Sequence, residues 1–445
     1  MVVGEQQALA TRSPERLVRA VAKPSSGVAL AARRLLDEIA GGRLSPLSIT
    51  LRFWDGSELA GLSDEAVELR RPAALTHLLR APGQLGLARA WVDGSLDVPG
   101  ELEAVLRVRG AFSGVHLSAA DLLRSGWAAV QIMGRHALRL PAVPAVEAQI
   151  QGRRRSLGRD RRAVRHHYDV SNRFYRLVLG PSMVYSCAYF SGSQDSLELA
   201  QSRKLDLICR KLQLKSGQRL LDIGCGWGSL LIHAARHYGV AGVGVTLSEP
   251  QARLGRARAA EAGVGGRVEI RVQDYREVAD GPFDKIASVG MYEHVGRAEL
   301  GRYTAAVARL LRPGGLFLNH GITRLRPHAP EPDPFISRYV FPEGELHPVT
   351  DVMVAMQRAG LEVRDVESLR EHYPLTLRRW SANLAANREA AVAEVGAQRE
   401  RVWRLYMLAS ALGFEDGDIS IHQVLAARSG APHRLPLDRL ELLAA

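Results

Sequence analysis

The sequence predicts an α/β protein with a mostly parallel sheet covered by helices on both faces, preceded by a smaller α+β domain. From Gln218 onward, short apolar runs alternate with helical stretches, which is typical of βαβ units. Before residue 110 the strand-like and helical pieces are short and irregularly spaced. The length of 445 residues is too great for one ordinary domain, so two domains are expected.

Composition and charge divide the chain into four segments. Residues 1–28 are polar and interrupted by turn-forming residues, so we expect a flexible amino terminus. Residues 29–140 form the smaller domain, whose expected role is contact with lipid, with a membrane or with a second copy of the chain. Residues 141–162 form an Arg-rich linker, because closely spaced like charges resist packing into a core. Residues 163–445 form the catalytic domain with a helical carboxyl-terminal segment.

The expected elements follow from hydrophobic periodicity. In the smaller domain a helix is expected over 28–39, a strand over 47–53 and a helical stretch over 85–91, with helical spacing again over 116–140. Beyond residue 324 a Pro-rich insertion breaks the rhythm, and a final helical pair is expected at about 375–412. The strands expected in the catalytic domain are 219–223, 241–246, 268–272, 285–289 and 316–319.

Charge and cysteine content limit the classes of partner. The formal net charge of +12 permits attraction to anionic lipid or to nucleic acid, but no nucleic-acid-binding motif accompanies it, so no nucleic acid partner is expected. The spacing of Cys187, Cys209 and Cys225 matches no zinc site, so no metal is expected and a reducing cytoplasmic setting fits best. No apolar run is long enough to cross a bilayer, so a lipid substrate would be met at the membrane surface.

A glycine-rich loop carries the strongest local signal. An apolar strand ends in Asp222 and runs into Gly224, Gly226 and Gly228, which let the backbone turn sharply and a ligand approach closely. The Gly-x-Gly-x-Gly spacing differs from that of dinucleotide folds and is similar to motif I of class I methyltransferases. This resemblance implies a Rossmann-like, S-adenosylmethionine-dependent methyltransferase domain. The tip of the next strand, at Thr246, lacks the acidic residue typical of NAD sites.

Seven ordered blocks between His166 and about Trp380 resemble the cyclopropane-fatty-acid synthase and mycolic-acid methyltransferase family, which includes fatty acyl methylene and methyl-branch synthases. The amino-terminal region resembles the extra domain of longer bacterial synthases only loosely. The matching blocks are His167–Asn172, Met183–Phe190, Leu221–Gly228, Gly244–Gln251, Ser288–Gly296, His320–Ile322 and Glu371–Leu377.

The resemblance implies two sets of site residues. The residues that it places against S-adenosylmethionine are Tyr185, Ser186, Asp222, Gly224, Gly226, Gly228, Thr246, Leu247, Gln251, Asp274 and Tyr275. The residues that it places around a bicarbonate ion, beside the transferring methyl group, are Cys187, Glu293, His320, Ile322 and Tyr373.

The chemistry of an alkene explains why such a site is needed. An alkene is a weak nucleophile, so it needs a strong electrophile such as a sulfonium methyl group, and the attack leaves a carbocation that must be kept from water. Tyrosine faces can stabilise that charge, which suits Tyr185, Tyr292 and Tyr373. A proton must then leave, and no single side chain is an obvious base. A bicarbonate held by donors from His320 and Tyr373, and oriented by Glu293, would meet this need.

The expected function is therefore one-carbon transfer from S-adenosylmethionine to the double bond of an unsaturated acyl chain in a membrane phospholipid, giving a cyclopropane fatty acid. An alternative product is a methylene or methyl branch on an oleoyl chain, as in the 10-methyl stearate (tuberculostearic acid) route. Methylation of a small molecule or a protein, and lipid binding without catalysis, are further alternatives. The protein is expected in the cytoplasm, peripherally at the inner face of an anionic membrane, and a homo-oligomer is left open.

Overall fold

The computed structural model describes residues 27–39, 47–81, 83–108, 132, 141–148, 170–325, 334–342 and 344–444. The chain divides into two compact units. One comprises residues 1–147 with two short later segments, 333–335 and 401–409, and the other comprises 148–332, 336–400 and 410–445. Almost all of the helical stretch expected over 116–140, and the Arg-rich run of the expected linker, lie outside the described residues.

The amino-terminal unit contains a small mixed sheet with the strand order β2-β1-β3-β4, in which β1 and β3 are parallel. The helix expected over 28–39 is confirmed, whereas the strand expected from Leu47 begins only at Thr50, because residues 48–49 form a bend. Its elements are α3 (Gly27–Ile39), β1 (Thr50–Phe53), β2 (Glu58–Leu59), β3 (Ala66–Leu69), α4 (Ala73–Arg80), α5 (Gln84–Val92), β4 (Leu96–Asp97) and α6 (Leu102–Arg107).

The buried side chain of Arg401 makes several contacts in the core of this unit. The guanidinium carbon of Arg401 lies 4.0 Å from the centre of the Trp91 ring, and the Trp91 indole donates a hydrogen bond to the Arg401 carbonyl at 2.9 Å. Arg401 also donates to the Leu96 carbonyl at 2.7 Å and pairs with Asp97 at 3.1 Å. Its charge is therefore paired and hydrogen-bonded, as a buried cation requires.

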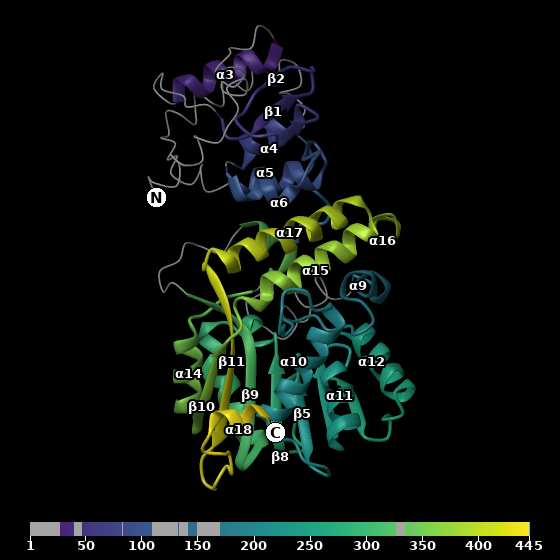
Figure 1. Ribbon diagram of the computed structural model, residues 1–445, viewed down its shortest axis with the longest axis vertical. Coiled ribbons are helices and arrows are strands. Elements are labelled where there is room, and N and C mark those ends of the chain that lie inside the picture. The colour runs from purple at the N-terminus through teal and green to yellow at the C-terminus, as the bar shows by residue number, and fades with distance from the viewer. Residues whose placement is uncertain are drawn as a thin grey trace. The chain divides into compact units, whose positions relative to one another are not determined.

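The second unit is built on a seven-stranded sheet with the order β10-β11-β9-β8-β5-β6-β7 (Figure 1). Its strands are β5 (Arg219–Ile223), β6 (Ala241–Thr246), β7 (Val268–Val272), β8 (Phe283–Val289), β9 (Leu311–Arg324), β10 (Leu361–Ser368) and β11 (Ile419–Arg428). Its longer helices are α9 (Asn172–Leu179), α10 (Leu197–Lys211), α11 (Ser229–Tyr238), α12 (Glu249–Glu261), α13 (Leu300–Leu310), α14 (Val349–Arg358), α15 (His372–Ala386), α16 (Arg388–Val395) and α17 (Ala397–Glu415), of which 401–409 belongs to the other unit. Shorter pieces are η3 (Tyr275–Glu277), η4 (Tyr292–His294), η5 (Arg297–Glu299), the π-helix η6 (Ile336–Val340) and α18 (Arg439–Ala444).

All five strands expected in this unit are confirmed, and they pair in parallel from β9 to β7. Two strands were not expected. β11 runs antiparallel between β9 and β10, and β10 carries an irregularity between Val363 and Asp365 that breaks its apolar alternation. The expectation of a helical pair at about 375–412 is wrong, because three helices, α15, α16 and α17, occupy 372–415.

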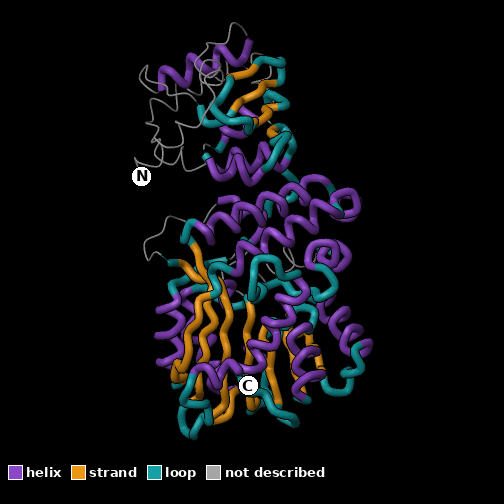
Figure 2. The backbone as a smooth tube through the Cα atoms, viewed as in Figure 1, coloured by secondary structure: helices purple, strands orange, loops and turns teal. Residues whose placement is uncertain are grey.

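Helices cover both faces of the sheet, as Figure 2 shows for the helix and strand layers. Leu205, Ile208, Leu231 and Ala234 belong to a core on one face that α10, α11 and α12 share, and Val307 belongs to the opposite core beneath α13 and α14. The unit therefore has the three-layer α/β architecture that its alternating pattern predicts.

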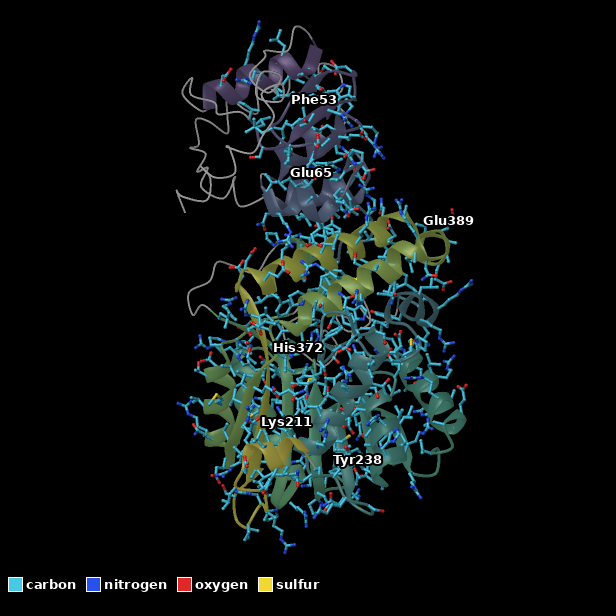
Figure 3. All side chains as sticks on the ribbon, in the orientation of Figure 1. Phe53, Glu65, Lys211, Tyr238, His372 and Glu389 are labelled. Atoms are coloured by element: carbon cyan, nitrogen blue, oxygen red, sulfur yellow. The ribbon has the colours of Figure 1, made fainter. Side chains whose placement is uncertain are left out.

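The antiparallel edge is tied to the rest of the unit by a buried charge. Lys211 at the end of α10, labelled in Figure 3, is fully buried and pairs with Glu367 at 2.5 Å and Asp365 at 3.3 Å. Both acids lie on β10, and Arg439 pairs with Asp365 at 2.7 Å. Because breaking a buried ion pair is costly, this cluster holds β10 in register against α10.

Candidate functional site

A cavity opens at the carboxyl ends of β5, β6 and β8, where ligands of open α/β sheets bind. Its floor is the glycine loop, in which Gly224, Gly226 and Gly228 all have positive φ angles of 84°, 52° and 77°. The amides of Gly224 and Cys225 donate to the Val245 carbonyl at 3.0 Å, which holds the loop against β6. An added Cβ on Gly226 would meet no protein atom within 4 Å, and Gly226 lines the cavity.

Ten of the eleven residues expected against S-adenosylmethionine line this cavity. Gly228 is the exception: it precedes α11 in a left-handed conformation, and a Cβ there would lie 2.7 Å from Ile270 Cδ1. Both the turn and the packing against Ile270 therefore require a glycine at this position. The ten lining residues are Tyr185, Ser186, Asp222, Gly224, Gly226, Thr246, Leu247, Gln251, Asp274 and Tyr275.

Local hydrogen bonds hold the cavity's walls in place. Thr246 donates to Gln251 Oε1 at 2.8 Å, so the turn after β6 is fastened to the first turn of α12. Asp274 is buried and accepts two hydrogen bonds from the Arg276 guanidinium, at 2.8 and 2.7 Å. The Trp227 indole donates to Asn172 at 2.8 Å, which fixes the glycine loop against α9. The described part of the block His167–Asn172 therefore supports the loop; its first three residues lie outside the described chain.

Lys204 is a cavity residue that the sequence analysis missed. It is buried on α10, lines the cavity, and donates from Nζ to Ser186 Oγ at 2.7 Å. Burial lowers the pKa of Lys204 to about 8, and the neighbouring Asp222 carboxylate partly opposes this shift. Burial likewise raises the pKa of Asp222 to about 7, and the Lys204 charge opposes that rise. The sequence does indicate that Lys204 is buried. It lies four residues after Ala200 and four before Ile208, on the apolar face of a helix.

Glu293, His320 and Ile322, called the polar cluster below, are placed by β9 and do not line the cavity: His320 and Ile322 lie on this strand, and Glu293 contacts the Ile322 amide. Glu293, on η4, accepts the Ile322 amide through Oε1 at 2.7 Å, and its Oε2 is buried with no hydrogen-bond partner among the described residues. Burial raises the pKa of Glu293 to about 7, opposed by the Ile322 amide. His320 is fully buried, its Nδ1 lies 3.1 Å from Gln423 Nε2, and its Nε2 has no partner in the described part of the chain.

The other two residues of the expected ion site are Tyr373, in the first turn of α15, and Cys187, in a segment that contacts this helix. The Cys187 thiol is buried, with its sulfur 3.8 Å from the Leu369 carbonyl, and burial raises its pKa. Tyr373 packs against Phe414, with ring centres 4.6 Å apart, and against Trp380 at 6.2 Å. None of the five ion-site residues lines the cavity as the described residues enclose it.

The first turns of α15 hold the Cys187 segment in place. Thr376 accepts the Ala188 amide at 3.1 Å, and His372 Nδ1 accepts the Phe190 amide at 3.1 Å. His372 is labelled in Figure 3 at the start of α15. Trp380 links this region to the cavity, because its ring lies 5.2 Å from that of the lining residue Tyr185.

Gly321 lies between His320 and Ile322 on β9, and other side chains pack closely against it. An added Cβ would overlap the Tyr292 ring and lie 3.2 Å from Glu293 Oε1, and the Tyr292 hydroxyl is held by the Ile322 carbonyl at 2.6 Å. Gly321→Ala should therefore displace Glu293, lower turnover at least about tenfold and reduce the free energy of unfolding by about 1–3 kcal/mol. Turnover and thermal unfolding measure both effects.

Gly301→Ala is the matched control, because Gly301 lies on α13 and an added Cβ there meets nothing within 4 Å. Replacing a helical glycine by alanine should stabilise the protein by about 0.5–1 kcal/mol without changing turnover. Wild-type activity and stability in Gly321→Ala would contradict the close packing of Tyr292 against this strand.

Comparison with known proteins places the chain among lipid-modifying enzymes. The family model described as mycolic acid cyclopropane synthetase matches residues 155–424. A probable fatty acid methyltransferase of Mycobacterium tuberculosis is 41% identical over 396 residues, covering 86% of this chain and 91% of that protein. The cyclopropane-fatty-acyl-phospholipid synthase of Escherichia coli K12 is 39% identical over 264 residues, covering 59% of this chain and 67% of that protein.

A solved structure agrees with this placement. The mycolic acid cyclopropane synthase CmaA1, in complex with SAH and CTAB, superposes with a TM-score of 0.57 at 34% identity, covering 60% of this chain and 98% of that one. The matching region includes the glycine loop, the polar cluster and the Cys187 segment. The chain belongs to the mycolic acid cyclopropane synthetase family and is an S-adenosylmethionine-dependent C-methyltransferase of that family.

Proposed function

We propose that the protein transfers a one-carbon unit from S-adenosylmethionine to the double bond of an unsaturated acyl chain in a membrane phospholipid, giving a cyclopropane fatty acid. The observation that carries the proposal is that two buried polar atoms, Glu293 Oε2 and His320 Nε2, have no hydrogen-bond partner among the described residues, and that His320 lies on β9 opposite the cavity-lining Val289. Methyl transfer to nitrogen or oxygen also releases a proton, but from an atom that exchanges protons readily with water. One-carbon addition to an alkene needs a buried proton acceptor, because a proton must leave carbon afterwards.

Aromatic side chains extend from the cavity-lining Tyr185 to α15 and would flank the developing positive charge. Tyr185, Trp380 and Tyr373 form a continuous run, with ring centres 5.2 and 6.2 Å apart. Their faces attract a cation, and their bulk excludes water from it. This chain's own contribution to the reaction is thus to bind the donor at the glycine loop, to shield the cationic acyl carbon, and to hold a proton acceptor nearby.

The residues present fit a bicarbonate ion. Bicarbonate has both a hydroxyl hydrogen and acceptor oxygens, so it needs one acceptor and at least one donor from the protein. An ionised Glu293 offers Oε2 as acceptor, and a neutral His320 with its proton on Nε2 is a donor. Glu293, His320, Tyr373, Cys187 and Ile322 would hold the ion. When bound, it would supply a base for the departing proton.

A second candidate product is a methylene or methyl branch on an oleoyl chain. The observation in its favour is the extent of similarity: the fatty acid methyltransferase relative matches 86% of this chain, and the cyclopropane synthase relative matches 59%. Both products arise from the same first cation and lose a proton from the transferred methyl group. The cyclopropane forms when this loss closes the ring directly. The methylene forms when a hydride first moves from the methyl-bearing carbon to the neighbouring cationic carbon, so the residues around the cation and the proton acceptor decide between the products.

The deciding experiment is expression in a bacterium fed oleate, followed by mass spectrometry of the phospholipid fatty acids with localisation of the double bond. A saturated product one CH₂ heavier with a ring at the former double bond supports the cyclopropane. An exocyclic methylene, or a 10-methyl branch if a host reductase acts, supports the second candidate. No modified acyl chain, with folded protein present, would refute both.

We further propose that the protein acts on lipid at an anionic membrane surface, at the inner face of the cytoplasmic membrane. The net charge of +12 supports this, because each basic residue near an anionic surface contributes about 1 kcal/mol. None of the helices that the structure describes is long and apolar enough to cross a membrane.

Activity on vesicles should therefore rise with the fraction of anionic lipid and fall with salt, since the attraction is screened over about 8–10 Å at physiological ionic strength. The measurement is turnover on oleoyl phospholipid vesicles of varied charge, with vesicles of neutral lipid as control. Faster reaction of free oleate or an oleoyl thioester in detergent than of vesicles would argue against a membrane-bound substrate.

A further inference from the structure

Gln423 lies directly against His320 in the interior of the sheet. The two residues face each other across the antiparallel pair β11 and β9, in a register fixed by nine consecutive residue pairs. Both are fully buried, and Gln423 Nε2 is 3.1 Å from His320 Nδ1. The rest of the Gln423 side chain makes no hydrogen bond within the described chain, so His320 is its one polar contact there.

The His320 ring is held neutral by its surroundings. Burial places the pKa of His320 well below its ordinary value, and the positive charges of Lys204 and Lys211 lower it further. Lys211 is itself paired with two β10 carboxylates, while Lys204 faces Ser186 and Asp222. A neutral imidazole carries one N–H, and the hydrogen bond at one ring nitrogen decides what the other nitrogen can do.

We propose that Gln423 is a positioning residue that holds the His320 proton on Nε2 by donating its own amide N–H to Nδ1. This inference rests on the proposed function, which needs a donor at Nε2. With the proton on Nδ1 instead, Nε2 would be only an acceptor and could not donate a hydrogen bond to an anion. Gln423 thus keeps His320 Nε2 as the donor that the proposed function needs.

Three variants test the inference. Gln423→Met has similar length and no donor, and Gln423→Glu offers only an acceptor to Nδ1 when ionised. Gln357→Met, at an exposed position of α14, is the matched control. Loss of the hydrogen-bonding partner of a metal-bound histidine typically costs about 10- to 100-fold in metal affinity or activity, and we expect a loss of the same order for the partner of His320. Both Gln423 variants should lose turnover in this range and keep S-adenosylmethionine affinity within about twofold, whereas the control should match wild type in both.

The most direct measurement is the tautomer of His320. It would not change if Gln423 had only a structural role. Proton–nitrogen correlation spectra of protein with ¹⁵N-labelled histidine, with the His320 signals identified by their absence in His320→Asn, should show the proton on Nε2 in the wild type. Gln423→Glu should move it to Nδ1, and Gln423→Met should give a mixture. The spectra are recorded without added bicarbonate, so they do not depend on the proposed reaction.

A wild-type proton on Nδ1, or an unchanged tautomer in both Gln423 variants, would overturn the inference. If the tautomer responds as expected while no modified acyl chain is found in the oleate experiment, the positioning role stands and the proposed function fails. Should Gln423→Met not fold, as judged by thermal unfolding, Gln423→Glu keeps the size of the side chain and carries the test.

Discussion

Glu293→Gln should lower turnover by about 10²- to 10⁴-fold, the range typical for loss of a group that handles a proton in the transition state. Glutamine keeps the shape of the side chain and its acceptor for the Ile322 amide, which is now 2.7 Å from Glu293 Oε1. It loses the charge and the capacity to share a proton. Because Glu293 does not line the cavity, S-adenosylmethionine affinity measured by calorimetry should change by less than about threefold.

The same substitution should change how stability depends on pH. Burial raises the pKa of Glu293 to about 7 from 4.5, so between these values the folded state holds a proton that the unfolded state has lost. The free energy of unfolding contributed by this group therefore falls as pH rises through that window. Glutamine cannot ionise, so the Tm of Glu293→Gln relative to wild type should increase from about pH 5 to about pH 8.

These two measurements check each other. A variant that unfolds at or above the wild-type temperature near pH 8 but does not turn over has lost chemistry and not its fold. Wild-type turnover in Glu293→Gln would end the ion-site mechanism, even if bicarbonate were bound. Indifference of the wild-type rate to added bicarbonate would be weaker evidence, because a tightly held ion can survive dialysis. A constant Tm difference across pH would mean that Glu293 is not buried as an acid.

Much of the catalytic fold could be predicted because the residues that determine each strand, loop and helix are close together in the sequence. The strand that ends at Asp222, the glycines after it and the helix that follows form one continuous pattern, and the structure places it as expected. The parallel strands 241–246 and 268–272 are apolar runs of ordinary length between clear turns. Fold and family followed from such patterns, and the family comparison confirmed both.

What could not be predicted depends on contacts between distant segments. In the sequence, β11 resembles a continuation of the helical region before it. Only its pairing with β9 brings Gln423 against His320, 103 positions away. The position of Lys204 on the apolar face of its helix indicates burial, but its contact with Ser186, 18 positions away, depends on how the loop before α10 folds back. The packing of Gly228 against Ile270, which requires glycine in addition to the turn into α11, likewise depends on a distant segment, and its contact with the ligand stays a prediction.

Gly226→Val should weaken S-adenosylmethionine binding by about a hundredfold or more, equivalent to about 2.8 kcal/mol of binding free energy. Gly226 lines the cavity, and a Cβ built on it meets no protein atom within 4 Å, so the branched side chain would occupy space that the ligand needs. Its φ of 52° is also disfavoured for a β-branched residue, so some loss of stability is expected besides.

Gly263→Val separates the two effects. Gly263 has a φ of 72°, an added Cβ there also meets nothing within 4 Å, and it lies in the turn after α12, outside the cavity. It should therefore lose stability through backbone strain as Gly226→Val does, yet bind S-adenosylmethionine with wild-type affinity in calorimetry. Equal affinity losses in both variants would assign the effect to strain, and unchanged affinity in Gly226→Val would mean that the ligand does not lie against the glycine loop.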